Sequence, residues 1–172
     1  ALAYLVLAGL YFRATPPLEA SDEAGHFSAA LFVKHQHRLP VADPADPSPT
    51  RSQEHAQPPL YYVLAVLLIH PVDTSNHLDF YAFRAGAPVG RADIPGPKNM
   101  FEMRGDRSFP WKKTMLAVAV LRGFSIVLGL GTVLVTFILV RRVFPADPRT
   151  AAFAACMVAF NPMFLFISSS VN

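Results

Sequence analysis

The chain has 172 residues, of which 52% are hydrophobic and 16% charged, and its mean hydropathy is positive. This balance favours an integral membrane protein. The net charge of +3 comes from basic residues dispersed along the chain, which argues against a nucleic-acid partner. The single cysteine, Cys156, excludes a disulfide within these residues.

The first twelve residues carry no charge and predict a truncated first transmembrane helix over residues 1–12. At 1.5 Å per residue this helix is about 18 Å long, shorter than the ~30 Å hydrocarbon core of a bilayer. A secretory signal peptide is the alternative interpretation, although no basic segment precedes the apolar stretch. Residues 13–113 then form the expected extracytoplasmic loop, rich in proline and broken by short helices.

An acidic cluster begins this loop, in which Asp22 and Glu23 are followed by His26. The pattern predicts an interfacial helix over about residues 21–36, with Ser21 as its N-cap. Carboxylates in a first helical turn oppose the helix dipole, and this stabilisation alone can account for both acids. It does not account for His26, which lies four residues after Asp22 on the same helical face.

The chemistry of the cluster suits the transfer of a group to a hydroxyl. Asp22 is the predicted general base, because a carboxylate within hydrogen-bond reach can take the proton that an acceptor hydroxyl loses. Glu23 and His26 are predicted to orient the base, to bind the acceptor, or to complete the ligand shell of a divalent metal ion. No third ligand stands out, so the need for a metal stays open.

A second signal, QPPLYY, runs from Gln57 to Tyr62. It opens a predicted helix over about residues 59–70, because proline is favoured in a first helical turn. About ten apolar residues give ~15 Å of helix, which suits a position at the membrane interface better than a crossing of the bilayer. The alternative is a helix over residues 55–72 that crosses the membrane. It would place residues 73–113 inside the cell and Arg141 and Arg142 outside.

Two long apolar segments, residues 114–140 and residues 151–172, are predicted to span the membrane. The connector of residues 141–150 contains three arginines and one acid, and short arginine-rich loops stay in the cytoplasm. Inside the second segment, Pro162 is expected to kink the helix, with Asn161 satisfying the break or bonding to a neighbouring helix.

This order of features resembles the N-terminal part of the GT-C-type polytopic glycosyltransferases. These include protein O-mannosyltransferases, lipid A aminoarabinose transferases and related bacterial families described only as predicted membrane proteins. Asp22 and Glu23 match the Asp-Glu motif in the first extracytoplasmic loop of that superfamily. His26 and Phe27 match the His-Phe of the O-mannosyltransferases, with one additional spacer residue here. Residues 161–172 look like the third transmembrane helix of the bacterial members.

The resemblance implies an all-α, multi-pass protein of a bacterial inner (plasma) membrane. This chain is then an N-terminal fragment of that protein and is inactive alone. It implies a polyprenyl-phosphate-linked sugar as donor and a lipid, glycan or protein acceptor outside the cytoplasm. Asp22 and Glu23 are then the catalytic residues. Arg122 is expected to bind the donor phosphate, or alternatively to snorkel to the membrane surface. The expected substrate-binding residues are His26, Gln57, Tyr61 and Arg122.

Other classes of function stay open. The chain could belong to a non-enzymatic polytopic membrane protein, such as an assembly or partner-binding subunit, or to a transporter. Two carboxylates beside the bilayer favour an enzyme, because a scaffold loop has no need of them. The absence of charge at the midplane of the two predicted spans argues against a transporter.

Overall fold

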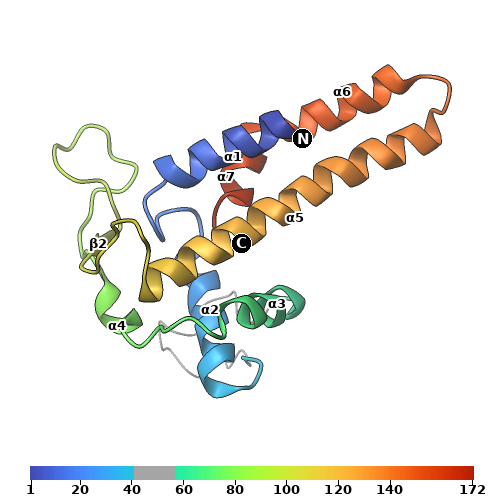
Figure 1. Cartoon of the computed structure of the whole chain (residues 1–172). Coiled ribbons are helices and arrows are strands. Elements are labelled where there is room, and N and C mark those ends of the chain that lie inside the picture. Colours follow the sequence, from blue (N-terminus) through green and yellow to red (C-terminus); the bar gives the residue numbers. More distant parts are fainter. Residues whose placement is uncertain (41–56) are drawn as a thin grey trace. The chain divides into compact units, whose positions relative to one another are not determined.

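The computed structural model describes residues 1–40 and 57–172 (Figure 1). The part of the chain that the structure describes is mostly helical, with 58% of those residues in helices and 4% in strands. The predicted all-α class is therefore correct in its coarser form, and the two short strands were not expected. Residues 41–56, which belong to the predicted loop and include the start of the alternative span 55–72, lie outside the described residues.

The described residues form two compact units, and each has its own core. One unit combines residues 1–16 with residues 121–172, and the other comprises residues 17–120. The first unit is built from four helices, with α5 crossing the boundary between the units (Figure 1). These helices are α1 (Leu2–Ala14), α5 (Lys113–Val143), α6 (Pro148–Ala159) and α7 (Pro162–Ser168).

The longest helix, α5, contains the predicted segment 114–140 and is about 46 Å long at 1.5 Å per residue. Arg141 and Arg142 lie in its last turn, where positive charge complements the helix dipole. Among the described residues, α5 is the one continuous helix that is long and apolar enough to cross a membrane. The helices α1 and α3 are apolar but shorter.

The predicted span over residues 151–172, expected to be kinked at Pro162, is divided in the structure into α6 and α7. The two helices are bent by 62° at the break and meet the length and composition of a span only when taken together. Pro162 begins α7, and the Asn161 side chain accepts hydrogen bonds from the backbone N–H groups of Met163 at 3.0 Å and Phe164 at 3.1 Å. Pro162 therefore interrupts the helix and Asn161 caps the helix that follows, as expected. The bend of 62° is sharper than the expected kink.

Close packing in the first unit depends on a glycine in α5. A Cβ atom at Gly129 would overlap the Tyr4 hydroxyl and would lie 2.9 Å from the Cβ of Ser168. The Tyr4 hydroxyl donates a hydrogen bond to Oγ of Ser168 at 2.9 Å. Gly129 therefore allows side chains of α1 and α7 to meet against the backbone of α5. Small residues have this function in many membrane helix bundles.

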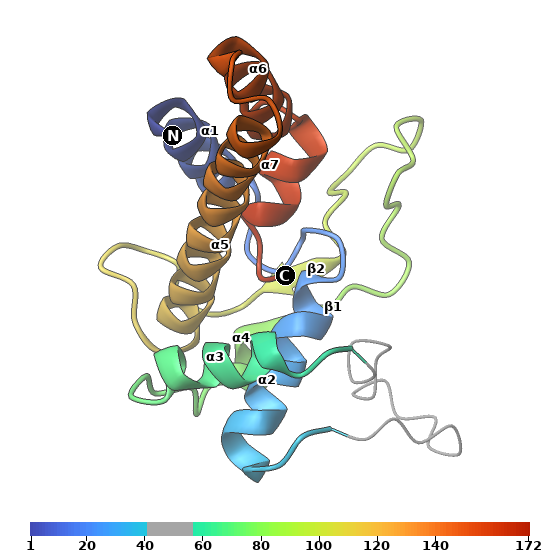
Figure 2. The ribbon, with the colours of Figure 1, turned by 90° about the vertical axis from the view of Figure 1, so that its right-hand side faces the viewer.

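The second unit contains α2 (Glu23–Gln36) and α3 (Leu60–Ile69), which pack side by side (Figure 2). These correspond to the predicted helices over residues 21–36 and 59–70. The ten residues of α3 give about 15 Å of helix, as the interfacial interpretation expects. One face of α3 is buried, while leucines on the rest are exposed, namely Leu60, Leu64, Leu67 and Leu68.

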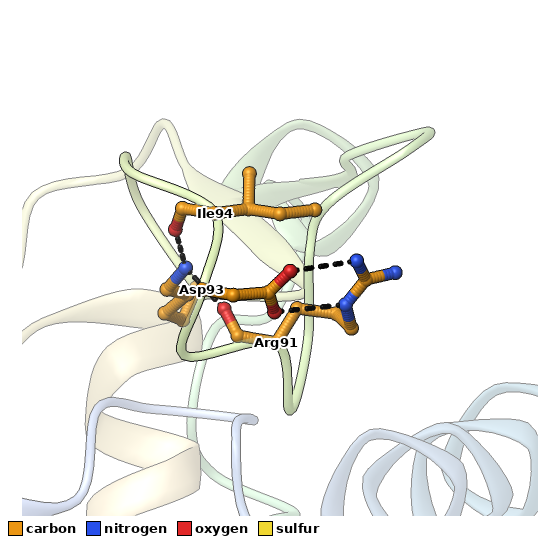
Figure 3. A network of polar contacts seen from close by, with 4 residues as sticks. Arg91, Asp93 and Ile94 are labelled. Carbon is orange, nitrogen blue, oxygen red and sulfur yellow. Dashed lines mark hydrogen bonds and ion pairs between the residues drawn. The ribbon is translucent and has the colours of Figure 1, made fainter.

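The short helix α4 (His77–Phe80) leads directly into a two-stranded antiparallel sheet. Its strands are β1 (Tyr81–Phe83) and β2 (Phe101–Met103). The loop between the strands is held by local polar contacts (Figure 3). Arg91 and Asp93 form an ion pair at 2.8 Å, and the Lys98 ammonium donates to the carbonyl oxygens of Arg91 and Ile94. Exposed contacts of this kind shape a loop more than they stabilise a fold.

Candidate functional site

The acidic cluster lies on a strained segment that leads into α2. Leu18 and Asp22 have φ angles of 64° and 59°, in the left-handed region. For a residue such as Leu18 this conformation costs roughly 1–2 kcal/mol, whereas aspartate adopts it more readily. Two anchors hold the segment: Leu18 is fully buried, and the Glu19 carboxylate accepts hydrogen bonds from the backbone N–H groups of Met100 at 2.9 Å and Phe101 at 2.7 Å. The backbone before α2 is therefore fixed despite its strain.

Asp22 immediately precedes α2, and its side chain is exposed. Its carbonyl oxygen accepts a hydrogen bond from the N–H of His26 at 3.0 Å, whereas its carboxylate makes no capping hydrogen bond. The prediction of Ser21 as N-cap is wrong, because the left-handed Asp22 occupies that position. Helix capping by its side chain therefore does not account for this acid, and the carboxylate faces solvent at a fixed point of the backbone.

Glu23, the first residue of α2, differs from Asp22 in its exposure, because its side chain is fully buried. A buried carboxylate is tolerated only when other groups compensate its charge or when it is protonated. The two predicted catalytic acids are thus not equivalent. A substrate arriving from solvent can meet Asp22, whereas Glu23 can act only through the residues packed around it.

His26 and the QPPLYY motif come together through Tyr62. Nδ1 of His26 lies 2.9 Å from the hydroxyl oxygen of Tyr62, and the two rings are stacked with centroids 6.1 Å apart. Tyr61, the predicted substrate-binding residue, meets the His26 ring edge-on at 6.5 Å. Gln57 is exposed at the start of the segment that leads into α3. The hydrogen bond to Tyr62 fixes the His26 imidazole one turn after the acids.

Arg122 belongs to the other unit and is 1% exposed. Its guanidinium donates to the carbonyl oxygens of Phe12 at 3.0 Å, Thr15 at 2.8 Å and Pro16 at 2.9 Å. These oxygens lie at the C-terminal end of α1, where carbonyl groups lack partners inside the helix. Arg122 therefore caps α1. The snorkelling interpretation is wrong because the guanidinium is buried, and a contact with phosphate stays a prediction.

A metal ion would need more ligands than the acidic cluster supplies. Within residues 1–40 and 57–172, no three side chains of His, Cys, Asp or Glu gather in a group that could hold one. Nδ1 of His26 already contacts Tyr62. Glu23 and His26 therefore lack a third protein ligand of these types in that part of the chain.

Two residues of this site escaped the sequence analysis. Glu19 lies three residues before Asp22, but its partners are about eighty residues away in the chain, so no local pattern identifies them. Tyr62 could have been found, because Tyr62, Ala65 and Ile69 follow the spacing of one helical face and are the buried residues of α3. That spacing indicates that Tyr62, rather than Tyr61, points toward the protein interior.

Comparison with known proteins identifies no relative of this chain. No family model matches the chain, and neither a curated protein nor a solved structure is significantly similar to it. The resemblance to GT-C glycosyltransferases therefore rests on the motifs of the sequence, and the structure contributes the geometry of the residues in them.

Proposed function

We propose that the chain is part of an integral-membrane glycosyltransferase of the GT-C type, which moves a sugar from a polyprenyl-phosphate donor to an acceptor outside the cytoplasm. One observation carries the proposal: a strained and anchored segment presents the Asp22 carboxylate to solvent directly beside the buried Glu23. Backbone strain of this kind concentrates at functional sites, where the surrounding structure must maintain it.

The apolar helices support a membrane location. Side chains along α5 are exposed although they are apolar, among them Val127, Leu134 and Ile138. Exposed leucines on α3 would contact lipid if that helix lies at the interface. An inner-membrane, multi-pass protein is consistent with α5 as one span and the bent pair α6 and α7 as a second, broken one.

In the proposed reaction, Asp22 acts as the general base. Its carboxylate takes the proton of the acceptor hydroxyl while the acceptor oxygen bonds to the anomeric carbon of the sugar. The bond from that carbon to the phosphate oxygen breaks, and polyprenyl phosphate leaves with the electron pair. The proton remains on Asp22 until solvent removes it. Attack opposite the leaving group inverts the anomeric centre.

The neighbouring residues then have positioning roles in this proposal. Glu23 is buried at the start of α2, so it is proposed to hold the backbone beside Asp22 without contact with substrate. His26 is held by Tyr62 and stabilises the first turn of α2. Gln57 and Tyr61 are proposed to contact the acceptor or the sugar, because Gln57 is exposed and Tyr61 half-buried.

The decisive experiment measures sugar transfer in membranes that contain the full-length protein of which this chain is proposed to be a part, using a panel of radiolabelled polyprenyl-phosphate sugars. Asp22→Asn is expected to lower the transfer rate roughly 100-fold or more, as loss of a general base does. Asp79→Asn is the matched control, because Asp79 is another exposed acid of the same unit. A normal rate in Asp22→Asn, at a normal amount of protein, overturns the role of Asp22. No turnover of any donor by the unaltered full-length protein favours the non-enzymatic alternative.

Sidedness provides a second test. In a Cys156→Ser background, a cysteine introduced as Ser21→Cys should react with a membrane-impermeant maleimide added outside the cell. A cysteine introduced as Arg142→Cys should react only after the membrane is opened. Labelling of position 21 only from the cytoplasmic side would contradict the proposed reaction, because the donor and acceptor would then lie on the other face.

A further inference from the structure

A cavity of about 400 Å³ lies in the second unit, between α2 on one side and α4 with the first residue of β1 on the other. This volume is in the range of sites for small organic ligands. Apolar side chains contribute part of the lining, namely Leu31, Phe32 and Leu78. The cavity involves none of the residues of the acidic cluster, so it is a separate feature of α2.

The polar part of the lining consists of groups that can donate hydrogen bonds. Ser28, His35, Gln36, His77 and Tyr81 provide hydroxyl, imidazole and amide groups. No carboxylate is among the described residues that line the cavity. A ligand group rich in hydrogen-bond acceptors therefore matches this lining better than a cation does.

Thr74 orients the two histidines of the lining. Nδ1 of His77 lies 2.8 Å from the Thr74 carbonyl oxygen, and because a carbonyl only accepts, this nitrogen carries the proton. Nε2 of His35 contacts Oγ1 of the same threonine at 3.2 Å. The two rings lie with centroids 5.1 Å apart. One buried residue thus holds both imidazoles and leaves the second nitrogen of each ring for a ligand.

The charges around the histidine pair are mainly positive. The Lys34 ammonium donates to Oγ1 of Thr74 at 3.1 Å and to the carbonyl oxygen of Val72. The Arg38 guanidinium lies 5.5 Å from the centroid of the Phe32 ring. The acids of neighbouring segments, Asp73 and Asp79, are exposed and do not line the cavity.

These charges act on His35. Burial lowers the pKa of His35, and the positive charges of His77, Lys34 and His37 lower it further. A negative charge in the cavity would oppose that repulsion and favour protonation of the pair.

We infer that this cavity binds a small organic oxyanion, a carboxylate or phosphate on a compact apolar body, with the anionic group at His35 and His77 and the body against Leu31, Phe32 and Leu78. The protonated imidazoles donate to the anion, and binding takes up protons from solvent. The inference is independent of the proposed sugar transfer, since no residue of the cavity belongs to the acidic cluster.

Calorimetric titration of the purified chain in a non-ionic detergent tests the inference, with benzoate and phenyl phosphate as probes. Both should bind, and their affinity should rise as the pH falls from 7.5 to 6, by up to about tenfold per pH unit for each proton taken up. Inorganic phosphate, benzyl alcohol and benzylamine should bind much more weakly. His35→Gln and His77→Gln should each remove the pH dependence and most of the affinity, whereas His70→Gln, at an exposed histidine of the same unit, should change neither.

Several results would overturn the inference. Benzyl alcohol binding as tightly as benzoate would show an apolar cavity without anion selectivity. Binding of Zn²⁺ without binding of benzoate would assign the histidine pair to a metal. If the histidine variants do not fold, as judged by circular dichroism, Ser28→Leu fills the cavity and leaves both imidazoles intact. Undiminished benzoate binding in that variant would place the ligand elsewhere.

Discussion

His26 and Tyr62 are 36 residues apart in the chain, yet Nδ1 of the imidazole and the phenol oxygen lie 2.9 Å apart in a buried position. This contact joins α2, which begins beside the acidic cluster, to α3, which the QPPLYY motif opens. The two motifs of the sequence are therefore parts of one packed helix pair.

The first prediction concerns this hydrogen bond. Tyr62→Phe should lower the free energy of unfolding by about 1 kcal/mol, because a buried imidazole nitrogen loses its partner. Tyr81→Phe is the control, since the structure shows no hydrogen bond from that hydroxyl to a described residue. Denaturant unfolding followed by circular dichroism measures both. Equal losses in the two variants would show that the phenol–imidazole contact contributes nothing specific.

The second prediction concerns the cap of α1. Arg122→Lys should lower the free energy of unfolding by about 2–4 kcal/mol, because one ammonium group cannot reproduce the planar set of donors that reaches three carbonyl oxygens. Arg141→Lys should have little effect, because half-buried Arg141 bonds one carbonyl oxygen, that of Pro145. Thermal unfolding in detergent compares the two. An Arg122→Lys protein as stable as Arg141→Lys would refute the capping role.

The third prediction compares two glycines of α5. Gly129→Ala should destabilise the first unit by about 1–3 kcal/mol, because the new methyl group overlaps the Tyr4 hydroxyl and disturbs its hydrogen bond to Ser168. Gly131→Ala meets nothing within 4 Å and should be neutral or stabilising, as alanine favours the helix. The midpoint of thermal unfolding is the measurement. A stabilising effect at both positions would mean that the helices do not approach closely at Gly129.

The fourth prediction concerns pH. The pKa of His35 is lowered in the folded protein, chiefly by burial and also by His77, Lys34 and His37, so the unfolded chain binds a proton more readily. Its contribution to stability is therefore complete above the ordinary histidine pKa of about 6.5 and is lost as the pH falls below that value. His35→Gln should flatten the decrease in unfolding temperature between pH 7.5 and 5. An unchanged slope would show that other groups cause it.

The fifth prediction concerns the anchor of the strained segment. Glu19→Gln replaces one acceptor oxygen by an amide and should speed hydrogen exchange at the backbone N–H groups of Met100 and Phe101. Sugar transfer should fall as well, because Asp22 loses its fixed position. Glu102→Gln, at an exposed acid 3.6 Å from Arg104, should alter neither. Normal exchange in Glu19→Gln would mean that the anchor is dispensable.

Much of the helical architecture could be predicted because it depends on local composition. The apolar runs of α3 and α5 are bounded by prolines or arginines, and their predicted limits lie within a few residues of the observed ones. Asn161 and Pro162 predict a kink, whereas the structure has a break at which α6 and α7 are bent by 62°. An asparagine cap followed by proline starts a new helix in a new direction, so the pair is a stronger signal than a kink.

The site was harder to predict because its geometry depends on distant contacts. Asp22 adopts a left-handed conformation on a segment that Glu19 fixes to strand β2, about eighty residues later. The strands themselves have three residues each, which is too short for an alternating pattern to indicate a strand. Arg122 was expected to meet phosphate or solvent because nothing in its surroundings along the chain points to the end of α1.

The cap that Arg122 places on α1 has a consequence for biosynthesis. The oxygens of Phe12, Thr15 and Pro16 receive their donors from a residue synthesised more than a hundred positions later. Nascent chains halted just before residue 122 should therefore be cleaved by protease at residues 12–16, and chains halted well after it should resist. Equal cleavage of the shorter and the longer chains would show that groups other than Arg122 satisfy the carbonyl oxygens at the end of α1. The expected protection would show that the C-terminal end of α1 is completed only after Arg122 has been synthesised.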